Sequence, residues 1–307
     1  MVYVCQSNDK ALLSKSASGG AFSHLARIII GQGGAVFGAA WKHGLCKHVC
    51  VRTEEELAAI RGSKYVRSSL GDTFEQAKAL LDKGVPVLYS GTPCQLAALS
   101  AFLKKPYTNL YAVDLVCHGL PDDKIWDIYA SRFSNPPSTA AFRDKTEGWR
   151  RYSIRLTFPD GSVYRKPYTQ DTFMRAYISN LSLREACLRC KFNTSQKRAD
   201  ITLGDDWGGE LRDGGDLGTS LLITHTEKGD ELFEKARGQM RAEVTSFEKA
   251  AAANPVLLTP SRSHKKREEF LRLVDSGSFD KLVELWDKPP SRILGLLRRL
   301  KRKIIGH

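Results

Sequence analysis

Apolar and polar positions in the first part of the chain follow two alternating patterns. Short apolar segments have the length and composition of buried strands, at 34–41, 47–51, 85–90 and 110–116. Segments of helical character, several with capping residues at their ends, lie at 19–31, 72–83, 93–103 and 121–133. This order of strands and helices predicts an α/β fold with a mostly parallel or mixed sheet flanked by helices.

The pattern changes after about residue 136. Segments 152–158 and 163–168 flank a Pro-Asp-Gly turn, and two strands joined by such a turn are typical of a β-hairpin. The hairpin interrupts the alternation of strands and helices. We therefore expect an inserted β-hairpin lobe at this point of the fold.

The rest of the chain contains further strands and then mostly helices. Strands are predicted at 200–203 and 219–224, and the chain from 226 onward has a mostly helical pattern. We expect one body over residues 1–254 and a helical, basic tail over residues 255–307.

Composition and charge narrow the class of protein. The chain has 307 residues, of which 42% are hydrophobic and 26% charged, so a disordered, collagen-like or multi-spanning membrane protein is excluded. Forty-seven Lys and Arg against 34 Asp and Glu give a net charge of +13. A nucleic acid, an anionic membrane, an acidic protein or an anionic cofactor would each match that charge.

The positive charge is concentrated at the end of the chain. Residues 292–307 carry six Lys and Arg and no acidic residue, and their apolar residues share one helical face. Such a segment could lie on an anionic membrane or dock a partner, or it could pack on its own domain. No nucleic-acid-binding motif accompanies the charge, so we expect no nucleic-acid partner.

The sequence also bears on the compartment. No apolar run approaches the roughly 18 residues of a spanning helix, and the N-terminal residues lack the pattern of a signal peptide. We expect a cytoplasmic protein, peripheral on the inner membrane face if its tail binds lipid. Its seven cysteines would then be thiols, free to bind metal or to react.

Four of the cysteines are candidates for a metal centre. Cys94 follows the strand predicted at 85–90, and Cys117 follows the strand at 110–116. A single right-handed crossover places both at the carboxyl ends of neighbouring parallel strands, where open α/β sheets bind ligands. Cys187 and Cys190 form a C-x-x-C pair. Four thiolates suit zinc or a [4Fe–4S] cluster, and the single C-x-x-C pair favours a cluster.

The remaining cysteines carry weaker signals. Cys46 and Cys50 lie close to two histidines and could form a second metal site, or they could be buried structural residues. Cys5 has no evident partner in the sequence and is expected to be structural.

Two glycines precede the first long helix. Gly19 and Gly20 follow a run of Ser, Lys and Ala residues, and such a helix N-terminus suits a phosphate because its N–H groups are accessible. The same residues could serve only as a helix cap. The chain has no dinucleotide-binding G-x-G-x-x-G, Walker A, G-x-S-x-G or H-E-x-x-H motif.

Several short motifs together carry a family resemblance. They run in one order over about residues 1–210, as Ser16-Ala17-Ser18-Gly19-Gly20, Gly34-Ala35-Val36-Phe37-Gly38, Arg61-Gly62-Ser63-Lys64-Tyr65-Val66, Ser90-Gly91-Thr92-Pro93-Cys94-Gln95, Cys117-His118-Gly119, Phe142-Arg143-Asp144-Lys145, the Cys187/Cys190 pair, and Asp200 to Gly208. In these motifs the chain resembles the beta-subunit family of coenzyme F420 hydrogenases and dehydrogenases.

The resemblance implies a flavin and iron–sulfur oxidoreductase. Family members bind FAD and a [4Fe–4S] cluster and pass electrons between a ferredoxin-type chain and a small organic molecule. That molecule is deazaflavin F420 in archaeal members and a chlorophyll derivative in a plant relative. Because many relatives begin with a ferredoxin-like domain and this chain begins after that point, a separate ferredoxin-like carrier is implied.

The resemblance also implies roles for individual residues. The cluster ligands would be Cys94, Cys117, Cys187 and Cys190. The FAD-binding set would be Ser16, Ser18, Gly19, Gly20, Gly62, Ser63, Lys64, Tyr65 and Thr92. With these cofactors, Lys64 could neutralise a phosphate or lie near the flavin ring, where its charge would stabilise reduced flavin. His118, beside Cys117, could hydrogen-bond a cluster sulfur or shuttle a proton. Arg143 and Lys145 could face an anionic substrate or lie on a charged loop.

One residue departs from the family pattern, and one alternative function stays open. Asp206 stands where an aromatic residue is usual, at a contact with the flavin or substrate. The alternative is a non-catalytic or zinc-binding protein of the same fold that docks an anionic membrane or partner through its basic tail.

Overall fold

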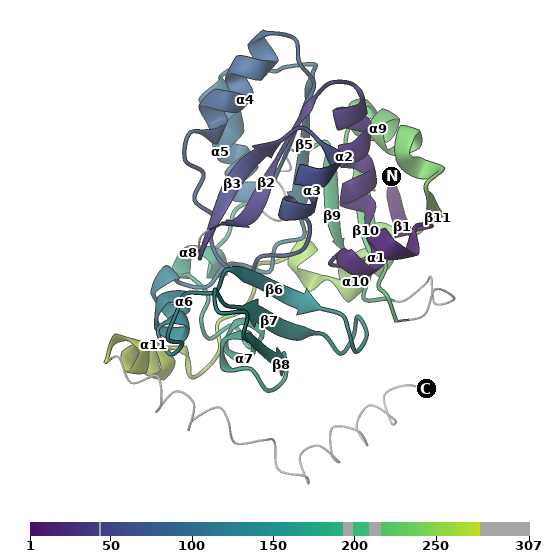
Figure 1. Cartoon of the computed structure of the whole chain (residues 1–307). Coiled ribbons are helices and arrows are strands. Elements are labelled where there is room, and N and C mark those ends of the chain that lie inside the picture. Colours follow the sequence, from purple (N-terminus) through teal and green to yellow (C-terminus); the bar gives the residue numbers. More distant parts are fainter. Residues whose placement is uncertain (43, 193–198, 209–215, 277–307) are drawn as a thin grey trace, which may run out of the picture.

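The computed structural model describes residues 1–42, 44–192, 199–208 and 216–276. Within these residues, eight strands form one mixed sheet in the order β11-β1-β10-β9-β5-β4-β2-β3 (Figure 1). Its strands are β1 (Val2–Ser7), β2 (Ala35–Lys42), β3 (Leu45–Val51), β4 (Val87–Gly91), β5 (Leu110–Leu115), β9 (Ile201–Asp205), β10 (Ser220–Thr224) and β11 (Met240–Val244).

The sheet has a parallel centre and antiparallel edges. Strands β2, β4, β5 and β9 run parallel to their neighbours in that series. Strand β3 pairs antiparallel with β2, and β10, β1 and β11 continue antiparallel from β9. The predicted α/β fold with a mixed sheet is thus confirmed. Over the described residues from 226 onward the chain is mostly helical, as expected. The short edge strand β11 was not predicted there, because its mostly exposed residues lack a strong apolar pattern.

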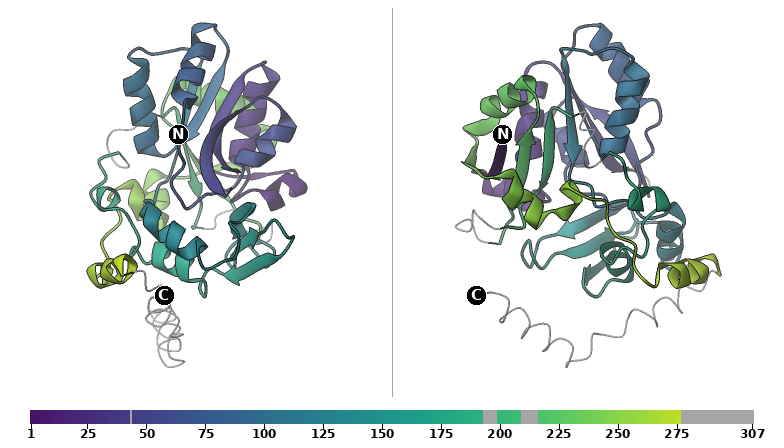
Figure 2. Two further views of the ribbon diagram at one scale, coloured as in Figure 1. Left: turned by 60° about the vertical axis from the view of Figure 1, so that its left-hand side comes forward. Right: turned by 180° about the vertical axis from the view of Figure 1, so that it is seen from behind.

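Helices cover both faces of the sheet, as the two views of Figure 2 show. On one face α2 (Ala21–Gly31), α3 (Glu54–Ile60) and α9 (Glu227–Arg237) contribute to one apolar core. On the other face α4 (Thr73–Asp82) and α5 (Pro93–Leu103) form a second core. Alternate residues of β2 enter the two cores, because successive strand side chains point to opposite faces.

The predicted hairpin is present, as part of a larger lobe. Strands β7 (Ser153–Thr157) and β8 (Val163–Pro167) flank the Pro-Asp-Gly turn, in which Gly161 has a φ of 82°. A third strand, β6 (Thr139–Asp144), pairs with β7. The lobe lies against the lower end of the main sheet in Figure 1, with the helices α6 (Asp123–Ala130), α7 (Thr172–Ile178) and α8 (Glu185–Leu188).

The last described elements pack on this framework. Helix α10 (Phe247–Ala253) and the short 3-10 helix η1 (Pro255–Leu257) cover β10. Helix α11 (Arg267–Asp275) inserts Phe270 and Val274 into the core of the lobe. The division into residues 1–254 and 255–307 stays a prediction, and the basic segment 292–307 lies outside the described residues. No helix in the described part is long and apolar enough to cross a bilayer.

The N-terminal elements place the glycine pair. Strand β1 lies between β10 and β11, with Tyr3 opposite both Leu222 and Val244. The short helix α1 (Lys10–Lys15) follows, and its N-cap Asp9 accepts hydrogen bonds from the N–H groups of residues 11 and 12. The chain then returns to the sheet edge and enters α2 at Gly20.

Candidate cofactor site

A cavity of about 560 Å³ is formed by the ends of the parallel strands, the lobe, and the loop of residues 16–20 before α2, here called the glycine loop. This volume falls within the range of about 300–1,000 Å³ that small-molecule and cofactor sites occupy. Ten of the residues singled out in the sequence line it, namely Ser16, Ser18, Gly20, Gly62, Ser63, Lys64, Tyr65, Thr92, Cys117 and His118. Residues predicted from separate motifs therefore share one site.

The N-terminus of α2 opens into this cavity. Gly20 is the N-cap residue and has a φ of 85°, a left-handed conformation that favours glycine. No described side chain caps the helix, and Gly20, Ala21 and Phe22 all line the cavity. Because the first N–H groups of a helix have no intrahelical partner, this end can bind an anion.

Gly19 has a different role from its neighbour. A Cβ atom at this position would lie 2.2 Å from the carbonyl oxygen of Cys5 and 2.5 Å from the backbone nitrogen of Ser220. The Gly19 carbonyl also accepts a hydrogen bond from the N–H of Ser7 at 2.8 Å. Gly19 is not among the cavity residues. It allows the loop to lie close against β1 and β10, so its contribution is to backbone packing.

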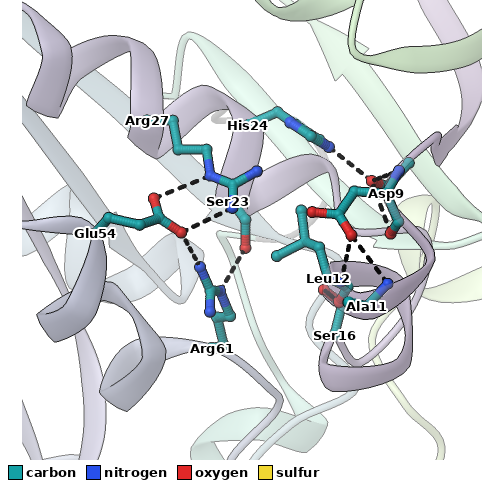
Figure 3. Close-up of polar contacts among 10 residues, drawn as sticks. Asp9, Ala11, Leu12, Ser16, Ser23, His24, Arg27, Glu54 and Arg61 are labelled. Carbon is teal, nitrogen blue, oxygen red and sulfur yellow. Dashed lines mark hydrogen bonds and ion pairs between the residues drawn. The ribbon is translucent and has the colours of Figure 1, made fainter.

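A network of charged residues links α3 to the first half of α2 (Figure 3). The Nε and Nη2 atoms of Arg27 donate to the two carboxylate oxygens of Glu54 at 2.9 and 2.8 Å. Arg61 donates to the same carboxylate at 2.6 Å and to the Ser23 hydroxyl at 3.0 Å. Hydrogen bonding from Arg27 lowers the pKa of Glu54. This network holds Arg61, which lines the cavity, next to the first turn of α2.

Arg61 belongs to one of the sequence motifs but was not assigned to the site. The signal that would have found it is its position as the residue before Gly62, which has a φ of 81° and directs the following segment along the cavity. Its side chain is only 12% exposed. A mostly buried arginine in a cavity wall is a strong candidate for binding a phosphate.

Lys64 also lines the cavity, but its ammonium group is hydrogen-bonded to backbone carbonyls. Its Nζ donates to the carbonyl oxygen of Arg61 at 2.7 Å and to that of Ala59 at 3.3 Å. Burial lowers the pKa of Lys64 to about 8. The adjacent Tyr65 stacks on Tyr177 with a distance of 4.7 Å between ring centroids.

The four candidate ligand cysteines converge beside the cavity. Strands β4 and β5 are parallel neighbours, so Cys94 in the first turn of α5 and Cys117 after β5 lie at the same edge of the sheet, as predicted. Cys187 lies in α8, and Cys190 follows it. Burial, together with smaller electrostatic contributions from the other three cysteines, raises the pKa of Cys117 to about 12. All four sulfurs are thus near enough to influence one another.

A glycine explains how the C-x-x-C segment reaches Cys117. Gly119 has a φ of 122°, and a Cβ atom there would lie 3.1 Å from the Cβ of Cys187. Close approach at this point lets the Leu120 N–H donate to the Cys187 sulfur at 3.4 Å. The Phe192 N–H donates to the Cys190 sulfur, also at 3.4 Å.

The arrangement of the four cysteines does not match a site for a single metal ion. Among the described residues, no three His, Cys, Asp or Glu side chains are grouped closely enough to hold a single metal ion. A [4Fe–4S] cluster takes one thiolate at each of its four irons, so its ligands surround a larger body than one ion. The Thr92 hydroxyl lies 3.2 Å from the Cys94 sulfur and also belongs to the cavity wall.

His118 lines the cavity next to Cys117. Its ring packs edge-on against Tyr177, with 5.3 Å between centroids, and its Nδ1 lies 3.5 Å from the Ser261 hydroxyl. The same hydroxyl donates to the His118 carbonyl at 2.5 Å. Burial lowers the pKa of the His118 imidazole, although nearby hydrogen-bond acceptors oppose the shift. The ring is therefore mostly neutral at pH 7.

Arg143 in β6 and Lys145 in the turn after it lie in different environments. Arg143 lines the cavity and forms an ion pair with Asp205 at 2.6 Å. Lys145 does not line it; its Nζ donates to the backbone carbonyls of Leu13, Ser18 and Leu217. Of the two alternatives open for this pair, facing an anionic molecule fits Arg143, and Lys145 is a buried structural cation.

The structure also places Asp206 and the three remaining cysteines. Asp206 lies outside the cavity wall, whereas the next residue, Trp207, contributes to it. Cys46 packs in the lobe core and Cys50 packs against the α4–α5 core, so the two do not approach the four candidate ligands. Cys5 is fully buried, beneath α2.

One histidine of the cavity wall was missed by sequence reasoning. The Nδ1 of His48 lies 2.8 Å from the Ser68 hydroxyl, and its Nε2 lies 3.0 Å from the Ser90 carbonyl. The ring stacks on Tyr89 with 5.7 Å between centroids. In the sequence, His48 was noted only as a neighbour of Cys46 and Cys50, and no sequence signal indicated a cavity there.

Known proteins resemble this chain in sequence and in fold. The family model for the carboxyl-terminal part of the beta subunit of coenzyme F420 hydrogenase/dehydrogenase matches residues 85–250. The chain is 25% identical over 263 residues to the F420-dependent formate dehydrogenase 1 subunit beta of Methanococcus maripaludis. The match covers 83% of this chain but only 62% of that relative.

A solved structure shares the fold. A chain from the F420-reducing [NiFe] hydrogenase complex of Methanosarcina barkeri superposes with a TM-score of 0.55 and 19% identity, covering 92% of this chain and 91% of that one. At this identity the likeness concerns the fold alone. The family model, however, covers more than half of the residues. The chain therefore belongs to the coenzyme F420 hydrogenase/dehydrogenase beta-subunit family.

Proposed function

We propose that this chain is a flavin- and iron–sulfur-dependent oxidoreductase. It relays electrons between a small organic redox substrate, either an F420-like deazaflavin or another molecule, and a ferredoxin-like carrier. One observation carries this proposal: the cavity that begins at the N-terminus of α2 ends at Cys117, one of four converging cysteines. A nucleotide-type site and a thiolate site that share a wall would bring two cofactors close enough for electron transfer.

The cavity residues fit FAD. The accessible amides of Gly20 and Ala21, with Ser18 and the guanidinium of Arg61, would hold its pyrophosphate. The segment from Gly62 to Tyr65 and the side chains of Ser16 and Thr92 would line the rest of the molecule. When bound, a flavin accepts two electrons together and can pass them on singly.

The cysteines fit a [4Fe–4S] cluster. Burial raises the pKa of Cys187 as well as that of Cys117, so these thiols need a neighbouring cation to become thiolates, and iron would supply that charge. The N–H groups of Leu120 and Phe192 donate to two of the sulfurs. Hydrogen bonds of this kind help to set the potential of a cluster.

The partners follow from the same reasoning. The relatives named above are subunits of a formate dehydrogenase and of a hydrogenase complex, which supports a partner protein that exchanges electrons with this chain. Because the chain spans only 62% of the curated relative, the carrier and the substrate are proposed by chemical class alone. The cytoplasmic location, the contact of residues 292–307 with an anionic membrane and the lack of a nucleic-acid partner stay predictions.

Cofactor content tests the proposal directly. The full chain should be purified anaerobically, and its flavin, iron and sulfide should be quantified with an absorbance spectrum. We expect bound flavin, with about four irons per chain. A colourless protein that contains zinc or no metal, even after anaerobic reconstitution, would instead support the non-catalytic or zinc-binding alternative.

Matched cysteine variants test the ligand assignment. Cys187→Ser should lose most of the iron and sulfide, because one of four thiolates is removed, while flavin binding is retained. Cys50→Ser is the control, since Cys50 is half-buried on β3 and apart from the four. Unchanged iron in Cys187→Ser would remove this residue from the ligand set.

A further inference from the structure

Arg143 is a buried cation in the wall of the cavity. It lies near the end of β6, and only 7% of its surface is exposed. Its Nη1 atom donates to the Asp205 carboxylate at 2.6 Å and to the Tyr65 hydroxyl at 3.3 Å. One edge of the guanidinium is therefore anchored to β9 and to the segment that follows α3.

The other edge of this guanidinium has donors without acceptors. The Nε and Nη2 atoms of Arg143 are buried and have no hydrogen-bond partner in the described part of the chain. These two atoms form the planar fork that pairs with two adjacent acceptors. In Arg27 the same fork is filled, because its Nε and Nη2 donate to both oxygens of Glu54 at 2.9 and 2.8 Å.

Buried Nε and Nη2 donors without acceptors destabilise the folded protein when no ligand is bound. A buried donor without a partner has lost its hydrogen bonds to water with no replacement, and the loss is larger when the group is charged. Burial opposes the charge of Arg143, but Tyr65 and Asp205 more than compensate, and its pKa lies above the ordinary value. The charge is therefore permanent. A bound molecule with two adjacent acceptor atoms would satisfy both donors.

Aromatic rings indicate the shape of that molecule. The guanidinium carbon lies 4.5 Å from the ring centroid of Tyr152 and 5.1 Å from that of Trp207. Tyr65 and Tyr177, stacked on each other, form another part of the wall. Tyr152 and Trp207 also line the cavity, and an aromatic wall of this kind suits a flat ring system.

The charges around Arg143 leave it available to an anion. Asp205 is the carboxylate that pairs with it, and the buried ammonium of Lys145 lies near both. Asp216, at the exposed end of this group, interacts with Lys145. Lys64 is less suited to face a redox ring, because its Nζ donates to two backbone carbonyls and its pKa is lowered to about 8.

We propose that Arg143, in place of Lys64, is the cation that contacts the flavin ring, and that its Nε–Nη2 fork receives the adjacent nitrogen and carbonyl oxygen on which charge collects. This inference rests on the proposed function. A hydride from the organic substrate, or two electrons from the carrier with one proton from water, would give the reduced ring one negative charge. The proton goes to the ring, and Arg143 keeps its own. The arginine then stabilises the reduced flavin more than the oxidised flavin.

The test compares binding of the two flavin states. Wild type, Arg143→Gln and Arg143→Lys would be loaded with FAD as full-length protein, and the flavin midpoint potential and the FAD dissociation constant would be measured. Arg143→Gln should bind reduced FAD at least about tenfold more weakly relative to oxidised FAD, which makes the potential more negative. Arg143→Lys should give an intermediate shift, because it keeps the charge but loses the fork.

Two further variants make the result specific. Arg165→Gln is the matched control, since Arg165 is also in the lobe but pairs with Glu147 and Asp144. Its potential should equal that of wild type. Asp205→Asn removes the carboxylate beside Arg143 and should shift the potential in the opposite direction. If Arg143→Gln does not fold, Arg143→Lys and Asp205→Asn carry the test.

The outcomes separate this inference from the proposed function. A flavin-loaded Arg143→Gln with the wild-type ratio of affinities would overturn the role of Arg143 and leave a flavoprotein in which it only pairs with Asp205. A wild-type chain that takes up no flavin after reconstitution would overturn both the function and this inference.

Discussion

The Nζ of Lys145 donates to the carbonyl oxygen of Ser18 at 3.3 Å, so a side chain of the lobe is bonded to the loop that precedes α2. The same ammonium donates to the carbonyl of Leu13 at 2.8 Å and to that of Leu217 at 2.5 Å. The lobe and the glycine loop are thus joined at one buried charge. Changes in the lobe should therefore reach the cofactor end of α2.

Replacing Lys145 by Met should weaken this joint. Three carbonyl groups would lose their donor in a site from which water is excluded, and we expect a loss of about 3 kcal/mol in the free energy of unfolding. Urea unfolding measures it. Lys124→Met is the control, because that lysine is in the lobe but 75% exposed. Equal stability of the two variants would show that the three bonds contribute nothing net.

Replacing Glu54 by Ala should weaken FAD binding. The carboxylate holds Arg27 and Arg61 in place, and without it Arg61 loses its fixed position beside α2. We expect the FAD dissociation constant to rise about tenfold, which corresponds to one charge-assisted hydrogen bond. Flavin fluorescence during titration of the apoprotein gives this constant. Glu55→Ala, on the exposed side of the same helix, should bind FAD as wild type does.

His48 should make stability depend on pH. Burial lowers its pKa below the ordinary 6.5, so the unfolded chain binds a proton that the folded chain does not. Stability contributed by this residue is therefore lost as pH falls below about 6.5 and is regained as pH rises. Unfolding free energies at pH 7.5 and 5.5 should differ less in His48→Gln than in wild type. His264→Gln controls for the removal of one imidazole, and an identical pH dependence in His48→Gln and wild type would contradict the assignment.

Much of the sheet could be predicted because its central strands are short apolar segments separated by helices. β1 and β6 were not predicted. The register of β1 is set by strands more than two hundred residues away, and only two of the six residues of β6 are buried, so neither has a strong local pattern.

The position of a site residue could be predicted where it follows from the order of the strands. Cys94 and Cys117 could be placed together because neighbouring parallel strands end at the same edge. The approach of Cys187 could not, because it depends on the backbone conformation of Gly119. Gly19 and Gly20 look alike in sequence, but only the structure shows that one packs on Cys5 and Ser220 while the other opens into the cavity.

The position of β1 in the sheet has a consequence for synthesis on the ribosome. Its partners β10 and β11 comprise residues 220–224 and 240–244. Both edges of β1 therefore stay unpaired until those residues have left the ribosome. At about 5–20 residues per second, this delay is on the order of ten seconds or more. The glycine loop is attached to β1 through the Ser7–Gly19 bond. The nascent protein is therefore exposed to mispairing at its first strand, and its cofactor site can form only when translation of the sheet is complete.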